Sequence, residues 1–129
     1  MIDSTLMLRQ IHPSFIKQGQ ITSQAFRPTT KDNSKLSVYD HDMISAEKAY
    51  EHYTKELLKS SAGIMAVNVK ECNELNLPVL SDPAPFPEHA LIDFSEYSYP
   101  QSEKLAKKLR QKAVERDWLY VCKNRFDSL

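Results

Sequence analysis

The segment from Ile64 to Val69 constrains the fold more than any other part of the chain. Apolar residues occupy both its odd and its even positions. Successive side chains of a strand point to opposite faces, so a strand that is apolar at both parities is covered on both sides. This segment is therefore predicted to be a central strand of a sheet.

Shorter strand-like segments and two helical patterns surround this strand. The strand-like segments are residues 5–11, 21–26, 36–39, 77–80, 90–94 and 118–121. Ser45 and Ser98 are suitable N-caps for two helices, and residues 71–76 read as one further helical turn. Leu105, Leu109 and Ala113 recur every fourth residue and predict the buried side of the second helix. We expect an α+β fold with a mixed or mainly antiparallel sheet of about five strands, two helices packed on one face, and a single domain over residues 1–129.

Composition excludes several functional classes. The chain has 17 basic and 17 acidic residues, which argues against general binding of polyanions. It has only two glycines, so neither the P-loop nor the dinucleotide-binding motif is present, and no cofactor is predicted. No segment approaches the roughly 18 apolar residues that span a bilayer, and the N-terminus does not resemble a secretory signal. Cytoplasmic location, no membrane association, and cysteines that remain thiols are expected.

A first candidate site lies in the polar N-terminal third. Arg9 and His12 flank the end of the first predicted strand, Ser23 follows the next turn, and Asp32 lies in the following loop. Arginine offers a planar fork for phosphate and histidine can transfer protons near pH 7, so these four residues are candidate catalytic residues for a phosphate-bearing ligand. The residues predicted to assist binding there are Gln24, Arg27 and Lys31. Alternatively, His12 and Asp32 only hold loop backbone through hydrogen bonds.

His89 and Asp93 form a second candidate pair, because they are four residues apart on a predicted strand and can share a face. Cys72 could serve as a nucleophile, but the neighbouring Glu71 and Glu74 would raise the pKa of its thiol.

The segment Asp40-His41-Asp42 contains metal-ligand residue types. Adjacent residues rarely point at one ion, however, so a solvated turn is favoured and no metal site is predicted.

The second predicted helix carries the strongest local excess of basic residues. Lys104, Lys107 and Lys108 could rest on an acidic partner or on a nucleic-acid backbone. The alternative is an ordinary solvated face, in which lysine stems cover apolar surface. Sequence-specific recognition of nucleic acid is disfavoured because no aromatic platform is interleaved with these lysines.

One set of short motifs resembles a pattern in small uncharacterised bacterial proteins. It comprises His12-Pro13-Ser14-Phe15, Ser23 to Pro28 (SQAFRP), Lys31-Asp32, Leu36-Ser37-Val38 and Pro87-Glu88-His89-Ala90. The resemblance covers most of the chain and implies a stand-alone bacterial protein, but it carries no catalytic role.

Two functions follow as expectations. The first is binding of a macromolecular partner, either another protein or a second copy of the chain; the resemblance suggests a toxin–antitoxin or phage-defence operon. The alternative is a small enzyme or sensor that acts on a nucleotide or RNA through Arg9, His12, Ser23 and Asp32.

Overall fold

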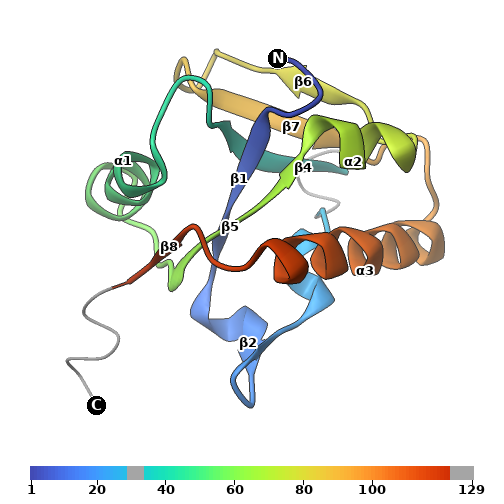
Figure 1. The fold of residues 1–129 in the computed structure, drawn as a ribbon, viewed down its shortest axis with the longest axis horizontal. Coiled ribbons are helices and arrows are strands. Elements are labelled where there is room, and N and C mark those ends of the chain that lie inside the picture. The colour runs from blue at the N-terminus through green and yellow to red at the C-terminus, as the bar shows by residue number, and fades with distance from the viewer. Residues whose placement is uncertain (29–33, 123–129) are drawn as a thin grey trace.

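The computed structural model describes residues 1–28 and 34–122, and its centre is a six-stranded sheet (Figure 1). The strand order is β6-β7-β4-β1-β5-β8, and every neighbouring pair is antiparallel. Its strands are β1 (Leu6–Ile11), β4 (Lys35–Asp40), β5 (Gly63–Asn68), β6 (Val79–Ser81), β7 (His89–Asp93) and β8 (Tyr120–Val121). β2 (Ile16–Lys17) and β3 (Gln20–Ile21) form a separate two-stranded sheet. The α+β prediction is confirmed, with six strands in the main sheet instead of about five.

Within the described residues, three α-helices accompany the sheet, instead of the two predicted. They are α1 (Ala46–Glu51), α2 (Val69–Glu74) and α3 (Tyr99–Arg116), and α1 continues as a π-helical turn, η4 (His52–Glu56). The predicted caps are present: the hydroxyls of Ser45 and Ser98 accept hydrogen bonds from the amides of Lys48 and Gln101. Two 3-10 turns, η1 (Pro13–Phe15) and η2 (Ser23–Phe26), follow β1 and β3.

The prediction of a strand over residues 21–26 is wrong beyond Ile21. Ala25 and Phe26 are consecutive and both fully buried in the same cluster, whereas a strand would point them to opposite faces. Short-range backbone hydrogen bonds from Ala25 to Thr22 and from Arg27 to Gln24 close a 3-10 turn instead.

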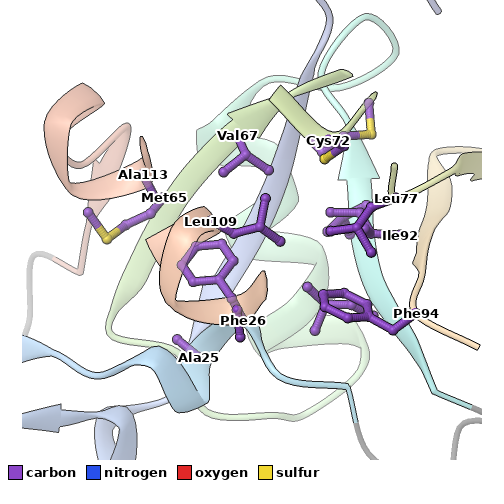
Figure 2. Packing of buried hydrophobic residues seen from close by; sticks show 14 of the residues in the cluster. Ala25, Phe26, Met65, Val67, Cys72, Leu77, Ile92, Phe94, Leu109 and Ala113 are labelled. Carbon is purple, nitrogen blue, oxygen red and sulfur yellow. The ribbon is translucent and has the colours of Figure 1, made fainter. Parts of the chain in front are cut away.

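The larger core lies between one face of the sheet and a layer of α2, α3 and η2 (Figure 2). Leu109 and Ala113 of α3 meet Met65 and Val67 of β5, and Phe26 of η2 fills the adjacent space. All five side chains are at most 2% exposed, so this layer provides most of the apolar burial that stabilises the fold.

The opposite face of the sheet carries a smaller core under α1, which lies well apart from α3 in Figure 1. Leu8, Ile64 and Ala66 of the sheet pack there with Ala49 of α1. The expectation that both helices lie on one face is therefore wrong. The apolar residues at both parities of β5 need a cover on each side, and α1 supplies the second one.

The sheet opens along a seam between its two central strands. β1 pairs with β5 over all six of its residues, but the structure pairs it with β4 only at Met7–Asp40 and Leu8–Tyr39. β4 meanwhile continues along β7 from Tyr39 back to Lys35. The strands therefore diverge beyond Leu8, and Figure 1 shows β4 running away from β1 at a wide angle.

Within the described residues, no helix is long and apolar enough to cross a membrane.

A candidate active-site cleft at the open seam

A cleft of about 530 Å³ lies where β1 and β4 diverge. It sits on the α1 side of the sheet, between the end of η4 and the loop that joins β6 to β7. Its lining residues are Leu8, Arg9, Gln10, Ser37, Val38, Tyr39, Tyr53, Leu57, Lys59, Pro85, Phe86 and His89. Its volume lies within the roughly 300–1,000 Å³ of small-molecule sites.

Two cations line the cleft, and the Asp82 carboxylate lies 3.2 Å from its lining residue His89. The two cations are Arg9 and Lys59, and none of the described lining residues is an aspartate or a glutamate. The chain as a whole is balanced, with 17 residues of each sign. The two cations of this concave, partly apolar site can attract an anionic ligand.

Arg9 joins the two sides of the seam. Its Nε donates to the Ala25 carbonyl of η2 at 2.8 Å, and its Nη1 donates to the Ser37 carbonyl of β4 at 3.0 Å. Arg9 has the same parity as Met7 and Ile11, which point into the larger core. The guanidinium can reach Ser37 because β1 and β4 have already separated at this level, so it closes the seam from the α3 side.

Ser37, His89 and Asp82 form a linear arrangement at one wall of the cleft. His89 Nε2 lies 3.2 Å from Ser37 Oγ, and His89 Nδ1 lies 3.2 Å from Asp82 Oδ2. Nδ1 is also 3.0 Å from the Asp82 backbone carbonyl, which can only accept a hydrogen bond. Nδ1 therefore carries the proton in the neutral ring, and Nε2 is left to accept the Ser37 hydroxyl proton.

The exposure of Ser37, His89 and Asp82 suits an exchange of protons with a bound molecule. The Ser37 side chain is exposed, whereas His89 is only 8% exposed and Asp82 is intermediate. The ring of Phe86 packs edge-on against His89, with their centroids 5.1 Å apart, and holds the imidazole in place.

A second histidine, His52, packs against Tyr39 and Phe86 of the cleft. Tyr39 Oη lies 2.7 Å from His52 Nδ1, and His52 Nε2 lies 3.4 Å from the Glu56 carboxylate. Burial, with a smaller contribution from Tyr53, raises the pKa of Tyr39 above its ordinary value. The phenol therefore stays protonated and donates to His52, which fixes the Tyr39 ring in the cleft.

Gln10 supplies a polar atom without a partner beside the cleft. Its Nε2 donates to the Ala49 carbonyl at 3.1 Å, but its Oε1 is buried and has no partner among the described residues. An unpaired buried acceptor costs on the order of 1–3 kcal/mol. Such atoms in a native structure call for a structural or functional explanation.

The residues predicted from the N-terminal third do not all meet. Arg9 contacts η2, which contains Ser23 and the exposed Gln24, but neither of these residues lines the cleft. His12 Nδ1 accepts from the Ser14 amide and caps η1, which is the structural alternative considered for this residue. Asp32 and Lys31 lie outside the described residues.

Arg27 has structural partners. It pairs with Glu103 of α3 at 3.1 Å and donates to the Tyr99 hydroxyl at 3.0 Å. The guanidinium thus fastens the end of η2 to the first turns of α3.

Asp93 is not the carboxylate beside His89. It accepts a hydrogen bond from the Ser95 amide, and contacts with Ser95 lower the pKa of Asp93. Asp82, at the start of the β6–β7 loop, takes the place next to the imidazole.

Cys72 faces the larger core, fully buried. Burial, and to a lesser extent Glu71, raise the pKa of its thiol to about 12, so it is unsuited to act as a nucleophile near neutral pH. Cys122 is also a thiol.

The segment Asp40-His41-Asp42 forms the turn that leads to α1. Asp40 accepts from the Asp42 amide, Asp42 accepts from the Thr5 hydroxyl, and His41 Nδ1 lies 2.9 Å from the Ile44 carbonyl. Among the described residues, no three side chains of His, Cys, Asp or Glu come together in a way that could hold a metal ion.

Sequence reasoning missed Ser37, Asp82 and Lys59. Ser37 and Tyr39 alternate along a predicted strand, so a shared face could have been noticed. Asp82 could have been found by drawing β6 and β7 as a hairpin, in which the Asp82 amide donates to the His89 carbonyl. Lys59 follows the π-helical turn, and nothing in the local sequence indicated its position.

The cleft is lined by a hydroxyl, an imidazole and two cations beside aromatic side chains, and the Asp82 carboxylate lies 3.2 Å from that imidazole. This combination can bind an organic anion and can transfer protons. The chain matches no protein-family model, no curated protein and no solved structure.

Proposed function

We propose that this chain is a small enzyme or sensor that binds a phosphate-bearing, nucleotide-like molecule in the cleft at the open seam. The observation that carries the proposal is a cleft of about 530 Å³ that is lined by the exposed Lys59, by Arg9 and by the aromatic rings of Tyr39, Tyr53 and Phe86. Phosphate groups pair well with arginine and lysine, especially where water is partly excluded.

The aromatic side chains of the cleft support a planar group in the ligand. Tyr39 and Phe86 pack together with centroids 5.1 Å apart, and Tyr53 also lines the cleft. Lys59 Nζ stands 5.7 Å from the centre of the Tyr53 ring. A heterocyclic base can stack on such rings, while its phosphate pairs with Lys59.

Calorimetric titration tests the proposal, with AMP, CMP, GMP and UMP as probes and adenosine and inorganic phosphate as partial probes. At least one nucleotide is expected to bind with 1:1 stoichiometry and to raise the melting temperature, because binding stabilises the folded state. Each partial probe should bind more weakly. If no nucleotide binds at millimolar concentration and low salt, the proposal is wrong.

The variant Lys59→Glu tests whether the nucleotide binds in the cleft and not elsewhere on the surface. Lys59 is exposed, so this variant should fold normally while its nucleotide affinity falls about tenfold, equivalent to ~1.4 kcal/mol. Lys112→Glu, on the exposed side of α3, is the matched control and should leave the affinity unchanged. Equal losses in the two variants would place the ligand outside the cleft.

A second candidate function is binding of an acidic macromolecular partner at α3. Its lysines Lys104, Lys107, Lys108 and Lys112 are all exposed. Arg110 and Arg116 of the same helix are instead tied to the Ile21 and Ala66 carbonyls. The toxin–antitoxin or defence-type setting and self-association stay predictions.

Capture of the partner from the native host would test this second function. The wild-type chain should retain the partner at low salt, and Lys104→Glu/Lys108→Glu should release it. Equal retention by both would exclude α3 as the binding surface.

A further inference from the structure

We infer that Ser37 is a nucleophile, with His89 as its general base and Asp82 as the positioning residue, and that the cleft hydrolyses an acyl ester carried by a phosphate-bearing molecule. The nature of the substrate rests on the function proposed above, whereas the assignment of the nucleophile rests on geometry alone. Ser37 and His89 come from the paired strands β4 and β7, and Asp82 follows β6 directly, where its amide donates to the His89 carbonyl.

The geometry meets the requirements of an activated serine. A hydroxyl becomes a useful nucleophile when a base within hydrogen-bond reach can take its proton, and when a third group orients that base. Ser37 Oγ and His89 Nε2 are 3.2 Å apart, and His89 Nδ1 has both the carboxylate and the carbonyl of Asp82 beside it. Asp82 thereby selects the tautomer whose Nε2 can accept a proton.

The three residues also differ in exposure in the way that catalysis needs. Ser37 is exposed in the cleft, so a substrate can reach its hydroxyl, and His89 is buried behind it. A serine that served only to satisfy a core histidine would not have to line a cleft. Arg9 donates to the Ser37 backbone carbonyl and lines the same cleft, so it brings positive charge close to the reaction centre.

The reaction has two balanced steps. In the first, Ser37 Oγ bonds to the carbonyl carbon and gives its proton to His89 Nε2. The ester C–O bond breaks, and the departing alcohol takes that proton. In the second, His89 Nε2 accepts a proton from water, and the hydroxide bonds to the acyl carbon. The bond between that carbon and Ser37 Oγ then breaks, Ser37 takes the proton from His89, and the carboxylic acid leaves. Water is the only co-reactant.

A fluorophosphonate probe followed by mass spectrometry tests the nucleophile. The wild-type chain should be labelled once, at Ser37, whereas Ser37→Ala should remain unlabelled with an unchanged melting temperature. Ser81→Ala, an exposed serine next to Asp82, is the control and should be labelled like the wild type. Labelling at another serine, or no labelling of the folded wild type, would overturn the inference.

Turnover of 4-nitrophenyl acetate distinguishes positioning from a purely structural role of Asp82. Asp82→Asn should lower kcat by about 10²-fold or more and leave KM and the melting temperature nearly unchanged. Equal kcat values in Asp82→Asn and the wild type would remove Asp82 from the mechanism.

The two proposals fail in different ways. If nucleotides bind but Ser37 is not labelled, the cleft is a binding site and the nucleophile is refuted. If Ser37 is labelled and nucleotides neither bind nor slow the labelling, the hydrolase stands but its substrate carries no phosphate.

Discussion

Gly63, the first residue of β5, occupies a position that cannot accept a side chain. Its φ is +155°, and a Cβ there would lie 2.4 Å from the Tyr120 carbonyl oxygen and 3.0 Å from the Trp118 ring. The backbone oxygen belongs to β8 and cannot move away without breaking the β5–β8 pairing.

Gly63→Ala is therefore expected to lower the free energy of unfolding by about 3 kcal/mol, through overpacking and backbone strain. Urea denaturation followed by circular dichroism measures this loss. Gly19→Ala is the control: its φ is also positive, +76°, but its Cβ would meet nothing within 4 Å. It should cost only about 1 kcal/mol. Similar losses at both positions would show that the close approach of β8 is unimportant.

At the scale of the element, α2 depends on one carboxylate. Glu71 Oε1 accepts from the Asn68 amide at 2.8 Å, which completes a capping box, and from Arg116 Nη1 at 2.9 Å. Arg116 also donates to the Ala66 carbonyl at 3.0 Å. The last turn of α3 is thus connected to both α2 and β5 through two hydrogen bonds from one nitrogen atom.

Glu71→Ala should destabilise the chain by about 3 kcal/mol, because it removes the cap and leaves Arg116 without its carboxylate. Glu71→Gln keeps an acceptor for the cap and should cost about half as much. Thermal and urea denaturation measure both values. The control is Glu74→Ala, an exposed position on the same helix, which is expected to stay within about 0.5 kcal/mol.

Most elements could be predicted because their signals are local. Apolar residues at both parities predicted β5. An N-cap and core residues at every fourth position predicted α3. The arrangement of the helices could not be predicted in the same way. The burial of β5 on both faces already required two covering layers, but which helix covers which face depends on chain paths between distant segments.

The candidate site was harder to predict than the elements. His89 was identified, but its neighbours Ser37 and Asp82 come from other strands, and only their pairing brings them together. Asp93 was the wrong carboxylate because spacing along one strand does not show which residue of the adjacent hairpin lies closer. The cleft itself comes from the early end of the β1–β4 pairing, for which the sequence contains no separate signal.

At the scale of the whole molecule, stability should depend on pH in the alkaline range. Burial raises the pKa of the Cys72 thiol from 9.0 to about 12. Below pH 9 the thiol is neutral in both the folded and the unfolded chain, so its contribution to stability is complete. Above pH 9 the unfolded chain loses the proton first, and stability falls until the folded thiol also ionises near pH 12.

Urea denaturation at pH 7, 9, 10 and 11 measures this dependence. The free energy of unfolding should be nearly constant from pH 7 to pH 9 and should then fall. Cys72→Ala lowers stability at every pH, but should remove up to about 1.4 kcal/mol per pH unit from the alkaline slope. An unchanged slope in this variant would show that other groups, such as the buried Tyr39, cause the loss.

The central place of β1 has a consequence for synthesis on the ribosome. β1 is made before β4 and β5, so it has no sheet neighbour until they follow. Its α3-facing side chains, Met7 and Ile11, lack their full cover until α3 has been made. A nascent chain stalled before α3 would therefore expose an open apolar surface to chaperones.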